Sequence, residues 1–142
     1  MKTVRQLLES KAPGAVTIGP GASVFEALEL MAQRDVGAVV VVEEDRVVGI
    51  LSERDYARKV TLQNQASREI TVDRIMTDRV VYVQPAQTVD QCMALMTDKR
   101  IRHLPVIDDG RLIGVVSIGD LVRATIAEQD FVIKQLEMYI TS

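Results

Sequence analysis

The sequence predicts an α/β fold of the α+β kind, built from two packed β-α-β-β-α repeats and a C-terminal helix. Three observations lead to this fold class. The chain contains two copies of one segment, spaced 65 positions apart. Each copy alternates between strand-like and helix-like spacing of apolar residues. A unit of about 45 residues is too small to bury its hydrophobic face alone. We therefore expect the copies to pack around a pseudo-twofold axis.

The repeat is visible without any gap in the alignment. Val16–Arg58 match Val81–Arg123 with eleven identical positions, and many others are aliphatic in both copies. The segments just upstream, Thr3–Leu8 and Thr71–Met76, are also similar. The identical pairs include Gly49/Gly114, Ser52/Ser117, Asp55/Asp120 and Arg58/Arg123. A match of this length indicates duplication.

Each copy is expected to open with a short strand, at Val16–Ile18 and Val81–Val83, which leads into a proline-containing turn. A helix then begins at Ser23 or Thr88, and its apolar residues follow helical spacing. This order predicts that one helix follows the first strand in each repeat.

A β-hairpin is predicted next. Its first strand is the aliphatic run Ala38–Val42 or Leu104–Ile107, and its second is Val47–Leu51 or Leu112–Val116. Acidic and glycine residues between two β-branched runs are typical of a hairpin turn. A final helix is expected to begin directly after the hairpin, at Ser52 or Ser117.

These elements divide the chain. We expect repeat 1 with an N-terminal helix at 1–60, a polar linker at 61–70, repeat 2 at 71–124 and a C-terminal helix at 125–142. The last helix has an apolar stripe that no third repeat covers. The stripe consists of Val132, Leu136, Tyr139 and Ile140. Contact with a second subunit, giving a homodimer, is the favoured interpretation, and folding back onto the repeats is the alternative.

The composition and charge of the chain argue against several classes of function. Seventeen Lys and Arg against 20 Asp and Glu give a net charge of −3, which disfavours nucleic-acid binding. Cys92 is the sole cysteine, so we expect a buried apolar side chain, with no disulfide and no metal site. No apolar stretch is long enough for a membrane span, and no signal-peptide core is recognisable. We therefore expect a cytoplasmic protein.

A Ser-x-x-Asp motif follows each hairpin, as Ser52–Asp55 and Ser117–Asp120. The N-terminus of a helix offers free N–H groups to an anion, and a serine hydroxyl there can donate to phosphate. An aspartate one turn later can accept both hydroxyls of a ribose. The alternative is a capping box, which needs no ligand. The other two helices open with such boxes but carry the longer Glu26 or Gln91, so the shorter aspartate favours ligand contact.

Together these motifs resemble the cystathionine-β-synthase (CBS) domain. The resemblance is carried by Gly49–Asp55, its repeat Gly114–Asp120, the opening Val72–Thr77 and the run Arg102–Val106. It covers residues 3–123. In that family, two copies form a Bateman module whose clefts bind adenosine-containing ligands: AMP, ADP, ATP, NAD or S-adenosylmethionine. AMP is the ligand we expect first.

The resemblance implies two binding sites. The first would consist of Ser117 and Asp120 with Thr17, Gly37, Ala38 and Val115. The second would consist of Ser52 and Asp55 with Ile50, Tyr82, Arg102 and His103. Arg54, Arg102 and His103 would be the phosphate partners, because guanidinium binds phosphate oxygens in pairs. Since Gly119 is the counterpart of Arg54, the sites are not expected to be equal.

The leading interpretation is a regulatory module that binds an adenine nucleotide and passes this state to an unknown partner protein. The alternative is a structural module without ligand, in which the motifs are helix caps. An enzyme is not expected, because the chain has no GxGxxG or P-loop motif. His103 has no nucleophile or orienting carboxylate predicted beside it, so it is either a structural residue or a ligand contact.

Overall fold

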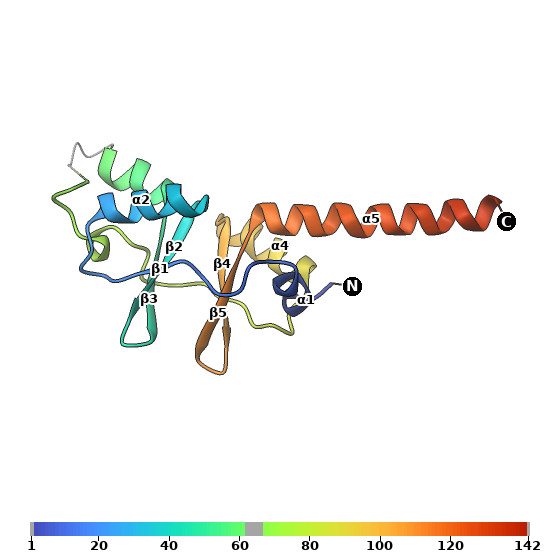
Figure 1. Cartoon of the computed structure of the whole chain (residues 1–142), viewed down its shortest axis with the longest axis horizontal. Coiled ribbons are helices and arrows are strands. Elements are labelled where there is room, and N and C mark those ends of the chain that lie inside the picture. Colours follow the sequence, from blue (N-terminus) through green and yellow to red (C-terminus); the bar gives the residue numbers. More distant parts are fainter. Residues whose placement is uncertain (1, 62–66, 142) are drawn as a thin grey trace.

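The computed structural model describes residues 2–61 and 67–141 of the chain. It contains two α/β lobes side by side, and one long helix extends from the second lobe away from both (Figure 1). The predicted fold class, two repeats with a C-terminal helix, is confirmed. Residues 62–66 of the predicted linker lie outside the described residues.

The first lobe is built on a three-stranded sheet of order β1-β2-β3, with β1 parallel and β3 antiparallel to β2. Ser23 caps α2 by accepting from the amide of Glu26, as predicted. The elements are β1 (Thr17–Ile18), α2 (Val24–Arg34), β2 (Ala38–Glu43), β3 (Arg46–Ser52), α3 (Glu53–Tyr56) and the π-helical turn η1 (Ala57–Thr61).

The second lobe repeats this order on a two-stranded sheet, β4-β5. Thr88 and Gln91 form the capping box of its first helix. The elements are α4 (Val89–Lys99), β4 (His103–Asp108), β5 (Arg111–Ser117) and α5 (Ile118–Thr141). Two leading segments precede the repeats, α1 (Val4–Glu9) and the 3₁₀ turn η2 (Val72–Arg74).

Both predicted hairpins are confirmed, and they share their irregularities. Glu44 and Asp45 have positive φ angles of 51° and 63°, and Asp109 and Gly110 have 50° and 77°. Two consecutive positive φ angles twist the turn to match the strands. Each hairpin also shifts register at the same point, after Val41 in one copy and after Val106 in the other.

The predicted strand Val81–Val83 is the one strand that differs. In the described part of the chain it is reduced to a single parallel bridge between Val83 and Val106. In the first lobe, the amide of Val40 donates to the carbonyl of Val16 at 3.0 Å. The counterpart of Val40 is Pro105, which has no N–H to donate. The first ladder bond is therefore missing in the second lobe.

The leading segments are exchanged between the lobes. The amide of Val4 donates to the carbonyl of Gln87 at 2.8 Å, so α1 joins the second lobe. The amide of Val72 donates to the carbonyl of Ala22 at 2.8 Å, so η2 joins the first lobe. Each segment thus precedes one repeat in sequence and packs against the other.

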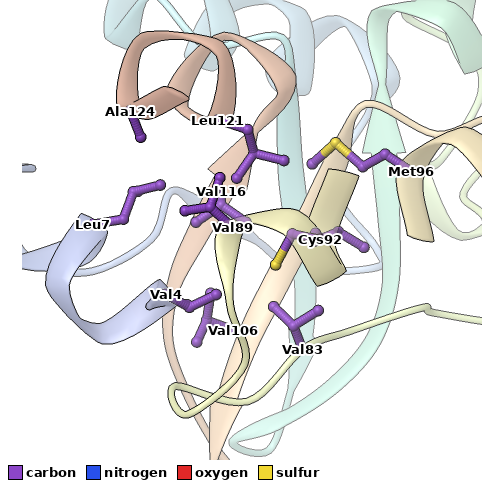
Figure 2. Packing of buried hydrophobic residues seen from close by; sticks show 11 residues of the cluster. Val4, Leu7, Val83, Val89, Cys92, Met96, Val106, Val116, Leu121 and Ala124 are labelled. Carbon is purple, nitrogen blue, oxygen red and sulfur yellow. The ribbon is translucent and has the colours of Figure 1, made fainter. Parts of the chain in front are cut away.

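The side chains follow the same exchange. Val4 and Leu7 of α1 are buried among residues of the second lobe (Figure 2), and Val72 and Ile75 are buried in the first. Cys92 is fully buried in the second core, and burial raises the pKa of its thiol. This environment agrees with the predicted role as a small apolar side chain.

Helix α5 is continuous from Ile118 to Thr141, so the final helix of repeat 2 and the predicted C-terminal helix are one element. Its first turns pack on the second lobe through Leu121 and Ala124, and its distal part extends away from the lobes (Figure 1). Across residues 2–61 and 67–141, no helix has the combined length and apolarity needed to span a membrane.

Candidate functional site

The two Ser-x-x-Asp motifs form matching turns where a strand passes into a helix. Oδ2 of Asp55 accepts from the backbone amide of Ser52 at 3.0 Å, and the Ser52 hydroxyl accepts from the amide of Asp55 at 3.2 Å. In repeat 2, the same bonds between Ser117 and Asp120 measure 2.8 and 3.1 Å. Both motifs are therefore capping boxes, and the ligand question depends on what surrounds them.

Asp55 lies in a broad cleft between the two lobes, with a volume of about 1020 Å³. We call it the Asp55 cleft. From the first lobe it is lined by Gly37, Ile50 and residues 52–55, 58 and 59; from the second, by residues 99–103 and Ile118. Thr77, Arg79 and Val81 of the connecting segment also line it. The cleft therefore contains polar, charged and apolar walls.

Positive charge is concentrated in this cleft. Among the described residues, seven Lys and Arg line it against two acidic residues, although the whole chain has a charge of −3. The cations are Arg54, Arg58, Lys59, Arg79, Lys99, Arg100 and Arg102. The acidic residues are Glu53 and Asp55. A cleft of this charge attracts anions strongly.

Asp55 itself has an oxygen directed away from the cap. Oδ1 accepts from the Thr77 hydroxyl at 3.4 Å and lies 3.4 Å from Nζ of Lys59. Both contacts are long, so they hold this oxygen weakly. It can therefore exchange these partners for hydroxyl donors of a ligand.

Two contacts join the lobes across the cleft. A guanidinium nitrogen of Arg54 donates to the carbonyl of Arg100 at 2.8 Å. His103 lies against Gly37, where an added Cβ would be 3.1 Å from its Nε2. Burial is the main reason that the pKa of His103 lies below its ordinary value; nearby Asp120 raises it, and Arg102 and Lys11 lower it. The imidazole is therefore neutral at pH 7.

Asp120 lies in a second, smaller cleft of about 440 Å³, which we call the Asp120 cleft. Its Oδ2 is 2.6 Å from Nζ of Lys11, and its Oδ1 accepts from Arg123 at 2.8 Å. Burial alone would raise the pKa of Asp120. The bonds from Lys11 and Ser117 more than offset this, so the pKa is lowered.

Of the residues predicted for the second site, the structure brings five into the Asp55 cleft, and Arg54 joins them. Tyr82 is absent from the described lining, although its neighbour Val81 is present. The five are Ile50, Ser52, Asp55, Arg102 and His103.

The set predicted for the first site is divided. Gly37 lines the Asp55 cleft, and Asp120 lines its own cleft. Among the described lining residues of these two clefts, four of the predicted residues do not occur: Thr17, Ala38, Val115 and Ser117.

Sequence reasoning missed Lys11 and five basic residues of the Asp55 cleft. The connection from Thr3 to Val16 is three residues longer than the one from Thr71 to Val81, and Lys11 lies in this longer connection. That insertion was a usable signal. The missed basic residues are Arg58, Lys59, Arg79, Lys99 and Arg100. Nothing in their spacing shows that they converge, because they come from three separate segments.

No metal site was expected from the sequence. Within the described ranges, no group of three or more His, Cys, Asp and Glu side chains is arranged to hold a metal ion.

Known proteins match this chain along most of its length. The CBS domain-containing protein CBSX3 of Arabidopsis thaliana, named as mitochondrial, is 45% identical over 123 residues. The match covers 83% of this chain and 60% of that protein, so the chain spans less than two thirds of this relative. A solved protein with CBS domains from Burkholderia ambifaria MC40-6 is 50% identical with a TM-score of 0.87, covering 90% of this chain and 96% of that one.

Two more distant solved structures are a ligand complex and a hexamer. The CBS domain pair of protein MJ0100, in complex with 5′-methylthioadenosine and S-adenosyl-L-methionine, is 28% identical with a TM-score of 0.79, covering 90% of this chain and 98% of that one. A hexameric CBS-CP12 protein from bloom-forming cyanobacteria is 28% identical with a TM-score of 0.76, covering 84% and 66%.

The family model for the CBS domain matches twice, at residues 4–61 and 72–127. These ranges contain both Ser-x-x-Asp turns and both leading segments. The chain belongs to the CBS-domain family, as two CBS domains in tandem.

Proposed function

We propose that this CBS pair is a regulatory module that binds an adenine nucleotide in the Asp55 cleft and transmits the bound state to a partner protein. The observation that carries the proposal is the meeting of seven basic side chains and one accessible carboxylate oxygen in a single cleft between the lobes. A nucleotide supplies both complementary groups, phosphate and ribose. CBS pairs are regulatory modules, and the MJ0100 pair binds two adenosine derivatives.

Each part of a nucleotide has a chemically suitable wall. Oδ1 of Asp55 can accept from ribose hydroxyls in place of Thr77 and Lys59. Arginine side chains can hold phosphate oxygens in pairs. Ile50, Val81, Ile101 and Ile118 offer apolar surface to the base.

The charge of the cleft favours phosphorylated ligands. AMP, ADP, ATP and NAD all carry phosphate, whereas S-adenosylmethionine carries a sulfonium cation that seven basic side chains would repel. AMP is the smallest ligand with both required groups. The surplus of cations supports additional phosphates as well, so we expect ATP to bind at least as tightly as AMP.

A ligand in this position touches both lobes. Arg54 and Arg100 approach each other across the cleft at 2.8 Å, and His103 of one lobe packs on Gly37 of the other. A nucleotide between them shifts the population toward one relative placement of the lobes, by its differential affinity for that placement. A partner protein that contacts both lobes can detect this shift.

Thermal unfolding tests the proposal. AMP, ADP, ATP, NAD, adenosine and S-adenosylmethionine are added to the wild type, because a ligand of the folded state raises the midpoint with concentration. We expect the phosphorylated ligands to stabilise, by about 2.7 kcal/mol at a concentration of 100 Kd. Asp55→Asn keeps an acceptor for the Ser52 amide and should abolish most of this effect. Arg46→Gln, at the exposed start of β3, is the control.

The phosphate contacts have their own test. Arg102→Gln should weaken ATP binding about tenfold and leave adenosine binding unchanged, because one charge-assisted contact contributes about 1.5 kcal/mol. Isothermal titration calorimetry measures both affinities. An equal loss for adenosine and ATP would contradict a phosphate role for Arg102. Recovery of unaltered ATP after incubation checks that the module binds without catalysis.

We also propose that the distal part of α5 holds two or more copies together. Its apolar side chains are exposed on several sides of the helix, and a helix that is apolar all round requires burial. Phe131, Ile133 and Leu136 are 63, 51 and 57% exposed. The cyanobacterial CBS-CP12 relative is hexameric. A homodimer is the smallest assembly that fits.

Sedimentation of Ile133→Glu/Leu136→Glu tests this assembly. We expect the wild type to be dimeric or larger and the double variant to be monomeric, with Gln135→Glu on the same helix as control. If the wild type assembles but binds no nucleotide, the structural module predicted as the alternative replaces the nucleotide sensor. Cytoplasmic location stays a prediction, since the Arabidopsis relative is named as mitochondrial.

A further inference from the structure

Lys11 gives the two clefts different chemistry. It lies on the connection between α1 and β1, and its ammonium reaches into the Asp120 cleft. Nζ is 2.6 Å from Oδ2 of Asp120 and donates to the carbonyl of Val115 at 2.8 Å. The side chain of Asp120 is only 8% exposed. The ammonium therefore pairs with a nearly buried carboxylate.

In the Asp55 cleft, Thr77 makes the corresponding two contacts. Its amide donates to the carbonyl of Ile50 at 2.9 Å, and its hydroxyl donates to Oδ1 of Asp55 at 3.4 Å. Ile50 is the counterpart of Val115 in the repeat. At Asp55 a backbone amide and a neutral hydroxyl therefore make these contacts, and the nearest ammonium, that of Lys59, is 3.4 Å away instead of 2.6 Å.

The backbone beneath Lys11 is held by the end of α1. The amide of Lys11 donates to the carbonyl of Leu8 at 3.1 Å, and the hydroxyl of Ser10 donates to the carbonyl of Leu7 at 2.7 Å. Leu7 is buried in the second core. The starting point of the Lys11 side chain is thus anchored, which lowers the entropic cost of keeping its ammonium at Asp120.

Both oxygens of Asp120 already accept from charged side chains. Oδ2 accepts from Lys11 and from the Ser117 amide, and Oδ1 accepts from Arg123. A ribose is neutral, so its hydroxyls would have to replace charged donors at 2.6 and 2.8 Å. Charge-assisted bonds are roughly twice as strong as neutral ones. In the Asp55 cleft, the same exchange displaces only contacts of 3.4 Å.

We propose that Lys11 is a specificity-determining residue that restricts nucleotide binding to the Asp55 cleft, because its ammonium occupies the place at Asp120 that ribose hydroxyls would take. One chain then binds one nucleotide. This inference rests on the proposed nucleotide function and adds which of the two clefts is used. It also assigns a role to the longer connection of repeat 1.

Calorimetric stoichiometry tests the inference. ATP and AMP are titrated into full-length wild type, Lys11→Met and Lys2→Met. Lys2 lines the same cleft, so its variant removes an equal charge without touching the pair to Asp120. We expect one nucleotide per chain for the wild type and for Lys2→Met, and two for Lys11→Met. Binding at the Asp55 cleft shows that each variant is folded.

A double variant isolates the opened cleft. Lys11→Met/Asp55→Asn should bind one nucleotide per chain, and adding Asp120→Asn should abolish it. Two nucleotides on the wild type, or one on both the wild type and Lys11→Met, overturns the role of Lys11 and leaves the proposed function standing. If the wild type binds none but Lys11→Met binds one, the proposed site in the Asp55 cleft fails and the role of Lys11 stands. No binding by any variant overturns both.

Discussion

Asp55 and Asp120 are the same residue of a duplicated motif, yet their surroundings differ. Each aspartate accepts a hydrogen bond from the amide of the serine three residues earlier, with nearly the same distance in both copies. Asp55 then faces a wide cleft with two contacts of 3.4 Å, whereas Asp120 is held at 2.6 and 2.8 Å by two cations. A repeated motif thus preserves its local structure. Whether its aspartate can accept hydrogen bonds from a ligand depends on the neighbouring segments that contact it.

The largest expected effect concerns the strand glycines that face the exchanged segments. A Cβ at Gly49 would overlap the Met76 thioether and lie 3.1 Å from the carbonyl oxygen of Thr77, which cannot rotate away. The atoms nearest a Cβ at Gly114 all belong to the Leu8 side chain, which can move. We expect Gly49→Ala to lower the free energy of unfolding by about 3 kcal/mol and Gly114→Ala by about 1 kcal/mol. Urea denaturation measures both, and equal losses would contradict the difference.

The next effect concerns the ion pairs of Asp120. Asp120→Asn removes the charge that Lys11 and Arg123 share, so we expect a loss of about 2 kcal/mol at pH 7. Because the pKa of Asp120 is lowered in the fold, its stabilising contribution is present above the unfolded value of 3.8. It is lost as pH falls through the folded pKa. The two stability curves should therefore converge in acid, and a constant difference down to pH 2 would contradict this.

A smaller effect concerns His103, which faces Gly37 across the lobe boundary. Its pKa is lowered mainly by burial, so below 6.5 the unfolded chain binds more protons than the fold. Stability contributed by the neutral imidazole is present above pH 6.5 and decreases as pH falls below it. We expect His103→Gln to flatten the stability profile in that window. Denaturation between pH 7.5 and 5 measures the slope, and an unchanged slope would assign it to other groups.

The smallest effect concerns an exposed ion pair. Arg5 and Asp108 lie 3.9 Å apart with side chains 61 and 49% exposed, whereas Lys11 pairs with the nearly buried carboxylate of Asp120. Arg5→Ala should change the free energy of unfolding by less than about 0.5 kcal/mol. A loss as large as that of Asp120→Asn would show that burial is not what separates the two pairs.

Sequence reasoning predicted the fold well, because apolar periodicity and the duplication both report on local structure. The helix starts at Ser23 and Thr88 and both hairpins agree with the structure. The prediction of a strand at Val81–Val83 was wrong for a reason that is visible in the sequence, because Pro105 has no N–H to donate to this strand. The continuity of α5 could not be predicted from the duplication, because the two copies stop matching at Arg123, inside the helix.

The candidate site was harder to predict, because it depends on residues that are distant in sequence. Ser52 and Asp55 could be identified from their motif, but Lys99 and Arg100 meet them only across the lobe boundary. The position of Lys11 depends on where α1 packs. Although α1 directly precedes the first repeat in sequence, it packs on the second lobe. No property of the motifs reveals that exchange.

The exchange of leading segments suggests how such a chain arose. In each half, the leading segment adds to the core of the other half through the same backbone bonds, Val4 to Gln87 and Val72 to Ala22. A single ancestral repeat could have formed a homodimer by trading these arms between two identical chains. Fusion of two such chains would keep the exchange, after which each copy could diverge. The longer connection that contains Lys11, and Gly37 where the other copy has Arg102, are two such differences between the copies.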